Sequence, residues 1–264
     1  MKKPDKKVKK ELTVEQKINR RNFISFATFT VLGVGAFEGW RWLYKSPQEA
    51  AGGITSGAHK PLRRALNKTE LFFRRVVFNE NHLVKTYPKS MAAKRVRVNS
   101  DIGIEANKKF DPAAWKLQVI KKGGEVLQVT LQELMALPKT EICYDFKCVE
   151  GWDQISHWGG VKFSDFMKHY QLDDYAKMQY VGMETPDKGY YIGVDMPSAM
   201  HPQTLLAYEV NDKLLPLEHG APLRLIIPVK YGIKNLKRIG TITFSNTRPR
   251  DYWAEEGYDY YSGL

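Results

Sequence analysis

The longest apolar stretch of the chain lies near its start, at residues 23–37, where fifteen successive residues carry no charge. As a helix this run would reach about 22 Å at 1.5 Å per residue, short of the roughly 30 Å core of a bilayer. Trp40, Trp42 and Tyr44 extend it and are typical of an aromatic belt at a membrane surface. We therefore expect an export signal or a membrane anchor over residues 22–44, with an uncleaved anchor modestly favoured.

After this segment in the sequence, the pattern predicts a linker and then one basic helix. Residues 46–60 are rich in Gly, Ala and Ser, which is typical of a flexible linker. Between residues 61 and 75, Leu62, Ala65, Leu66 and Thr69 recur at helical spacing among basic residues. This basic helix is expected either near the membrane surface or packed on the folded domain.

From residue 76 onwards the hydrophobic pattern changes to short strands and a few short helices. Thr130 and Glu133 form the sequence signature of a capping box that opens one of these helices, and a second helix is expected at 163–170. Strands are expected at 115–120, 126–129, 141–148, 177–183, 190–194, 205–210, 223–228 and 239–244. Many short strands with few helices predict an α+β domain, so we divide the chain into 1–21, 22–44, 45–75 and a single folded domain at 76–264.

The positive charge of the chain is concentrated in its first third. The total is +12, made up of +7 over residues 1–45, −1 over 46–59, +9 over 60–97 and −3 over 98–264. A nucleic-acid-binding domain would carry a basic face on its folded part. The distribution instead favours a basic arm that faces a membrane, and we expect no nucleic-acid partner.

The basic segment before the apolar run ends in Arg20-Arg21-Asn22-Phe23-Ile24. A basic region followed by a short apolar run is the layout of an export signal. The pair of arginines before an aromatic and an aliphatic residue resembles the twin-arginine signature. That resemblance implies export of a protein already folded around a cofactor.

The chain has two cysteines, Cys143 and Cys148, too few for a disulfide framework. Their odd spacing places them on opposite faces of the expected strand, where a bridge between them is geometrically awkward. Taken alone, Cys148 is either a buried structural cysteine or a thiolate ligand for a thiophilic metal.

The residues around Cys148 carry a family resemblance. Cys148-Val149-Glu150-Gly151-Trp152, followed by Trp158, resembles the molybdenum-binding loop of the sulfite-oxidase family. The segment 220–228, which begins Gly-Ala-Pro-Leu-Arg, resembles the family's Gly-Ala-Pro-x-Arg stretch, and 230–239 resembles its lysine-bearing loop around the cofactor phosphate. The resemblance covers residues 78–264 and is closest to the periplasmic branch that includes the methionine-sulfoxide reductase catalytic subunit.

The resemblance implies a site as well as a fold. It implies a single sulfite-oxidase-type domain holding molybdenum–molybdopterin, with Cys148 as the metal ligand and the catalytic residue. His219 stands where the periplasmic reductases have an asparagine, and we expect it still to hydrogen-bond the pterin. The residues that would contact the cofactor are Asn81, His82, Thr185, His219, Arg224, Asn235 and Lys237.

The function that follows is an oxidoreductase that transfers an oxygen atom, with two electrons, to or from a small sulfite-, sulfoxide- or oxyanion-like substrate. Electrons would be exchanged with a membrane haem or quinone-linked protein, on the periplasmic side of the inner membrane. The loops at 187–191 and 248–253 are expected to shape the mouth of the site. The alternative is a non-catalytic, membrane-tethered binding module on the same fold.

Overall fold

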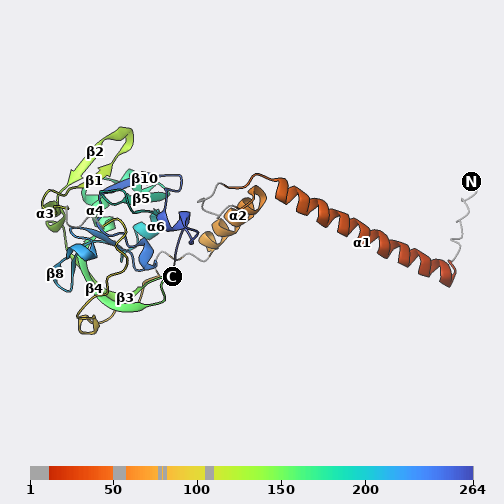
Figure 1. Ribbon diagram of the computed structural model, residues 1–264, viewed down its shortest axis with the longest axis horizontal. Helices are drawn as coiled ribbons and strands as arrows, with labels where there is room; N and C mark the ends of the chain where they lie inside the picture. Colours follow the sequence, from red (N-terminus) through yellow and green to blue (C-terminus); the bar gives the residue numbers. More distant parts are fainter. Residues whose placement is uncertain (1–11, 50–57, 77–78, 80–81, 105–109, 264) are drawn as a thin grey trace, which may run out of the picture. The chain divides into compact units, whose positions relative to one another are not determined.

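The computed structural model describes residues 12–49, 58–76, 79, 82–104 and 110–263 (Figure 1). They fall into two units, one with the described residues up to Glu49 and from Ala58 to Leu71, and the other with the described residues from Phe72 onwards. Residues 50–57, the centre of the expected linker, lie outside the described residues.

The first unit is dominated by one long helix, α1 (Val14–Lys45). It begins at a capping box, in which the Thr13 hydroxyl accepts from the Gln16 amide at 3.3 Å and the Gln16 side chain accepts from the Thr13 amide at 3.0 Å. Its 32 residues span about 48 Å, so its length and apolar composition would allow it to cross a membrane. The helix begins before the expected residue 22 and includes Arg20 and Arg21.

The helix expected at 61–75 is present as α2 (Lys60–Val76). In the second unit, the prediction of an α+β fold is confirmed by two five-stranded sheets. The first has the order β2 (Val126–Val129), β1 (Leu117–Ile120), β10 (Thr241–Ser245), β5 (Tyr180–Glu184) and β6 (Tyr191–Asp195). The second contains β3 (Thr140–Lys147), β4 (Asp153–Lys162), β7 (Leu205–Val210) and β8 (Lys213–Leu214), with β9 (Arg224–Ile226) paired to β7.

Short helices connect the strands. The capping box of Thr130 and Glu133 is present at the start of the first of them, with the Glu133 side chain accepting from the Thr130 amide at 2.7 Å. The α-helices are α3 (Leu131–Met135), α4 (Phe163–His169), α5 (Asp173–Ala176), α6 (Met196–Ala199) and α7 (Tyr252–Glu255). The 3₁₀ helices are η1 (Lys89–Met91), η3 (Lys122–Gly124), η4 (Leu217–His219) and η5 (Gly232–Lys234).

The strand predictions missed β4 and placed the start of β5 too early. The pattern did not predict β4, the longest strand of the described residues, because Gly159 and Gly160 interrupt its hydrophobic run. These glycines mark a register shift against β7, and a Cβ at Gly160 would lie 2.2 Å from the carbonyl oxygen of Leu206. The strand expected from residue 177 begins only at Tyr180, because α5 and a turn occupy the residues before it.

The main core draws on both sheets. Val119 and Ile192 come from the first sheet and Leu206 and Leu225 from the second, and each is at most 1% exposed. A smaller cluster packs around Trp158. The loops that follow β3, β5 and β9 extend from these cores. They carry Cys148, Thr185, Asn235 and Lys237.

Candidate functional site

Cys148 is the first residue after β3, at the start of a tight turn. Its amide donates to the carbonyl of Trp152 at 2.9 Å, and the Gly151 amide donates back to the Cys148 carbonyl at 3.1 Å. Gly151 has φ +85°, a left-handed conformation that favours glycine. The Cys148 thiol is 6% exposed, and burial raises its pKa. In the absence of a metal the sulfur is therefore a protonated thiol at neutral pH, and a thiophilic metal would bind it as the thiolate.

Cys148 opens onto a cavity of about 100 Å³. Asn235 and Lys237 share the lining with it, so three of the expected site residues meet around one space. Aromatic side chains supply much of the remaining wall. The full lining is Asn99, Ser100, Ile102, Cys148, Val149, Glu150, Tyr190, Gly232, Ile233, Asn235, Lys237, Trp253 and Tyr258.

Arg224 lies behind this cavity on β9, at 1% exposure. Its guanidinium donates to the carbonyls of His219 and Asn235, each at 3.2 Å, and stacks 4.6 Å from the Trp158 ring centre. Its Nε has no hydrogen-bond partner. Burial lowers the pKa of Arg224 to about 10, because the positive charge is poorly solvated. Arg224 borders a second, smaller cavity that also touches Asn99, so the two cavities are neighbours.

Lys237 is the second buried cation of the site. Its ammonium donates to the carbonyl oxygens of Asn99, Ser100 and Glu218, the last two at 2.6 and 2.9 Å. Among the described residues, no carboxylate pairs with Lys237 or Arg224. Burial, followed by the charge of Arg224, lowers the pKa of Lys237 to about 7. The two side chains form a positive, desolvated centre that an anion would stabilise.

His219, at the end of η4, is 6% exposed, and its Nδ1 has no hydrogen-bond partner. Burial and then the charge of Arg224 lower its pKa to about 4, so the ring is neutral at physiological pH. A neutral imidazole offers one donor and one acceptor. The adjacent Gly220 has φ +93°, and a Cβ there would lie 2.6 Å from Cβ of Lys237, so only glycine allows this close packing.

Of the other three expected contacts, the two that the structure describes, Thr185 and His82, do not line the cavity around Cys148. Thr185 is buried, and its hydroxyl donates to Asp187 at 2.6 Å, within its own turn. His82 is exposed and outside the cavity around Cys148, with its carbonyl 3.0 Å from Nε2 of His201. Asn81 lies outside the described residues. Contacts of these three residues with the cofactor stay predictions.

The sequence did not indicate Asn99 and Ser100, which cover Lys237 and line the cavity. No motif marks them, because only the tertiary structure brings a segment more than 130 positions away onto the lysine loop. The two loops expected at the mouth do supply cavity residues, namely Tyr190 and Trp253.

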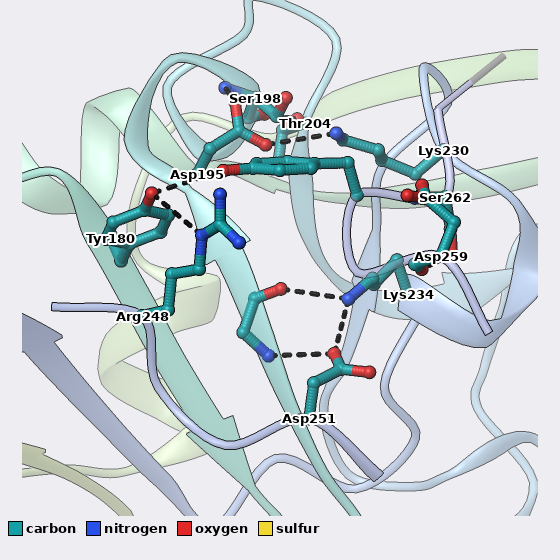
Figure 2. A network of polar contacts seen from close by, with 12 residues as sticks. Tyr180, Asp195, Ser198, Thr204, Lys230, Lys234, Arg248, Asp251, Asp259 and Ser262 are labelled. Carbon is teal, nitrogen blue, oxygen red and sulfur yellow. Dashed lines mark hydrogen bonds and ion pairs between the residues drawn. The ribbon is translucent and has the colours of Figure 1, made fainter. Parts of the chain in front are cut away.

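Two further lysines of the same loop, Lys230 and Lys234, are buried in ion pairs. Lys230 pairs with Asp195 at 3.0 Å, and Lys234 pairs with Asp251 and donates to the Gly193 carbonyl at 3.1 Å (Figure 2). These pairs attach the loop at 230–238 to β6 and to the segment before α7. Lys237 is the lysine of this loop that remains for an anionic ligand.

A second group of possible metal ligands, Glu141, His157 and Asp212, lies on the β3–β4 face. The ammonium of Lys89 already contacts both carboxylates, and Lys139 pairs with Glu141 at 3.1 Å. These lysines neutralise the carboxylates without a metal, so the group is best described as an ion-pair network.

Cys148 and Lys237 in this cavity, Arg224 beside the neighbouring one and His219 beside a third offer donor types that fit a molybdenum–pterin cofactor. A thiolate donor suits the metal. The unpaired Nε of Arg224 and the ammonium of Lys237 suit a phosphate, and the unpaired Nδ1 of His219 suits a polar heterocycle. The class defined by this fold and site is an oxidoreductase with a molybdenum–molybdopterin cofactor.

Comparison with known proteins gives the family. A model of the family "Oxidoreductase molybdopterin binding domain" matches residues 104–253. The chain belongs to this family: it is a molybdopterin-dependent enzyme of the sulfite-oxidase fold, and the predicted recognition, enzyme class and cofactor are confirmed.

Three known proteins illustrate the similarity. The chain is 36% identical to the Azospira oryzae protein named "Putative protein-methionine-sulfoxide reductase subunit YedZ1", over 71% of this chain and 70% of that one. It is 30% identical to the protein-methionine-sulfoxide reductase catalytic subunit MsrP of Burkholderia mallei, over 86% and 76%. The sulfane dehydrogenase SoxCD from Paracoccus pantotrophus superposes with a TM-score of 0.48 at 16% identity, over 64% and 46% of the two chains.

Proposed function

We propose that this enzyme reduces sulfoxides, with methionine sulfoxide as the substrate class, in the periplasm. The observation that carries the proposal is that Cys148 and Lys237 line one cavity whose remaining wall is largely aromatic and apolar. The names of the relatives from Azospira and Burkholderia support the choice of substrate.

When bound, the cofactor supplies two-electron oxygen-atom transfer at its metal. Cys148 would hold the metal at the end of β3. Arg224 and Lys237 would neutralise the phosphate of the pterin, and His219 would hydrogen-bond the pterin ring. Thr185, Asn235 and the pair Asn81–His82 would complete the contacts. The firm packing of Arg224 on Trp158 would orient the cofactor before the substrate enters.

The lining of the cavity supports a neutral substrate. Tyr190, Trp253 and Tyr258 present aromatic surface, with which thioether sulfur makes favourable contacts. An oxyanion such as sulfite would need a cation of its own. Lys237 alone in this lining is positively charged, and in this proposal the phosphate of the pterin takes its charge.

We further propose that the electrons come from a membrane haem or quinone-linked protein. The two cysteines of the chain are too few to hold an iron–sulfur cluster through four thiolates. The relatives are named as subunits, which supports a partner protein. α1 would anchor the enzyme to the periplasmic side of the inner membrane, after export through the twin-arginine pair Arg20-Arg21.

The domain organisation belongs to the same proposal: a cytoplasmic segment 1–21, an anchor helix 22–44, a linker and basic helix 45–75, and the catalytic domain 76–264. Membership of an oxidoreductase family leaves little support for the alternative of a non-catalytic binding module.

The test is to purify the full chain from a host that makes the cofactor and to measure molybdenum, released pterin and methionine-sulfoxide reduction with a reduced dye. We expect about one molybdenum per chain. Cys148→Ser should abolish turnover while the circular dichroism spectrum is unchanged. Cys143→Ser, which alters the other buried cysteine, should remain active.

Full turnover in Cys148→Ser would refute the role of this cysteine. Bound cofactor with sulfite oxidation but no sulfoxide reduction would refute the substrate and leave the cofactor site intact.

A further inference from the structure

The two sides of α2 differ sharply in character. At about 100° per residue, Leu62, Leu66, Phe73 and Val76 fall on one side of the helix. Their side chains are 47%, 47%, 55% and 64% exposed, so this apolar side has little protein cover in the described structure. Exposed contiguous apolar surface of this kind marks an interaction site.

The opposite side of α2 is basic. Lys60, Arg63, Arg64 and Lys68 lie there, with Glu70 as the acidic residue of the helix. Leu71 is the exception in the pattern, because it is apolar and 63% exposed but falls among the basic residues. A helix with one apolar and one cationic side is typical of a segment lying in a membrane interface.

The start of α2 is tied to the end of α1 within the first unit. The Lys60 amide donates to the Pro47 carbonyl at 2.9 Å, and Nδ1 of His59 lies 2.7 Å from the Ser46 carbonyl. The rings of Tyr44 and His59 are 5.2 Å apart. These contacts keep the first turn of α2 beside the aromatic end of α1, although many residues separate the two helices in sequence.

We propose that α2 lies in the surface of the membrane that α1 crosses, with its apolar side in the acyl region and its basic side among anionic lipid headgroups. The inference rests on the proposed anchoring by α1. The aromatic end of a membrane-spanning helix lies at the membrane interface, and the contacts between Ser46–Pro47 and His59–Lys60 place the start of α2 at the same level. Charge complementarity selects anionic lipid as the occupant. The enzyme would thus be attached to the membrane by two helices, α1 across the bilayer and α2 in its surface.

The test places a fluorophore on single introduced cysteines in the full chain, reconstituted into vesicles of phosphatidylcholine and phosphatidylglycerol. Labels at Leu66→Cys and Phe73→Cys probe the apolar side, and labels at Leu71→Cys and Arg64→Cys probe the basic side. The native cysteines are buried, so the unsubstituted chain serves as the labelling blank. Quenching by spin-labelled acyl chains is then compared between positions.

We expect a blue-shifted emission and several-fold stronger quenching at positions 66 and 73 than at 64 and 71. Replacing Lys60 and Lys68 together by Gln should weaken the quenching at position 66. Equal, weak quenching at all four positions would overturn the proposal. Labels at 66 and 73 that are blue-shifted but not quenched would also overturn it, because α2 would then pack on protein.

The same vesicles separate this proposal from the proposed function. Retention of the chain after an alkaline wash reports on the anchor α1, and molybdenum content with sulfoxide turnover reports on the active site. A chain that is retained and active but shows no quenching difference would contradict the role of α2 alone.

Discussion

At the scale of single residues, the lysines of the loop at 230–238 have different roles despite their similar spacing. Lys230 and Lys234 are neutralised by buried aspartates, whereas Lys237 contacts only carbonyl groups among the described residues. A buried ammonium without a carboxylate is costly, and an anionic ligand would reduce that cost. Binding of an anionic cofactor would therefore favour the charged form of Lys237.

Gly220 determines whether Lys237 can reach this position. We expect Gly220→Ala to destabilise the domain and to lower cofactor content, because the new Cβ would lie 2.6 Å from Cβ of Lys237 at φ +93°. Gly123→Ala is the matched control, since Gly123 has φ +81° with nothing within 4 Å. The control should cost only about 1–2 kcal/mol of backbone strain. Urea unfolding and molybdenum analysis would test this, and equal losses in both variants would contradict it.

At the scale of elements, the Lys234–Asp251 pair joins η5 to the segment that starts α7. Both side chains are nearly inaccessible, at 2% and 3% exposure. The Asp251 carboxylate also accepts from the amides of Gly193 and Ala254, each at 3.0 Å, so one residue links three elements. Trp253, two residues after Asp251, is part of the cavity wall, so this arrangement positions that wall.

Lys234→Met should therefore lower the free energy of unfolding by about 3–5 kcal/mol, because it leaves a buried carboxylate without its cation. Lys177→Met removes the exposed pair with Asp174, whose side chains are 76% and 89% exposed, and should leave the free energy of unfolding nearly unchanged because solvent screens the pair. Thermal and urea unfolding of both variants measure the difference. A similar small effect for both would show that the buried pair contributes little.

At the scale of the whole molecule, the lowered pKa values of Lys237 and His219 predict how stability depends on pH. In each case the unfolded chain binds a proton that the folded protein does not, so stability rises with pH between the folded and unfolded pKa values. For Lys237 this window runs from about 7 to the ordinary value of 10.5. For His219 it runs from about 4 to 6.5.

We expect the cofactor-free protein to become more stable as pH rises from 7 to 10, and Lys237→Met to lose this part of the dependence. Bound phosphate would favour the charged lysine, so the cofactor-loaded protein should show a smaller rise. Urea unfolding of the three forms across this range is the measurement. Identical pH profiles for the parent and Lys237→Met, both cofactor-free, would contradict the assignment.

The fold class, the enzyme family and the cofactor were predictable from the sequence, because the signals that indicate them are local. The Cys148 turn, the Gly-Ala-Pro-Leu-Arg segment and the capping box at Thr130 each depend on a few neighbouring residues, and so do most strand positions. β4 escaped prediction because its two glycines are explained only by contact with β7.

The pairing of charged residues and the set of side chains that share a cavity could be seen only in the folded protein. Asp195 and Asp251 reach Lys230 and Lys234 across the fold, and Asn99 reaches Lys237 from a distant segment. Burial and partner choice depend on long-range packing, which no local pattern encodes. For that reason Cys148 and Lys237 could be selected from the sequence, whereas the aspartate partners of Lys230 and Lys234 required the structure.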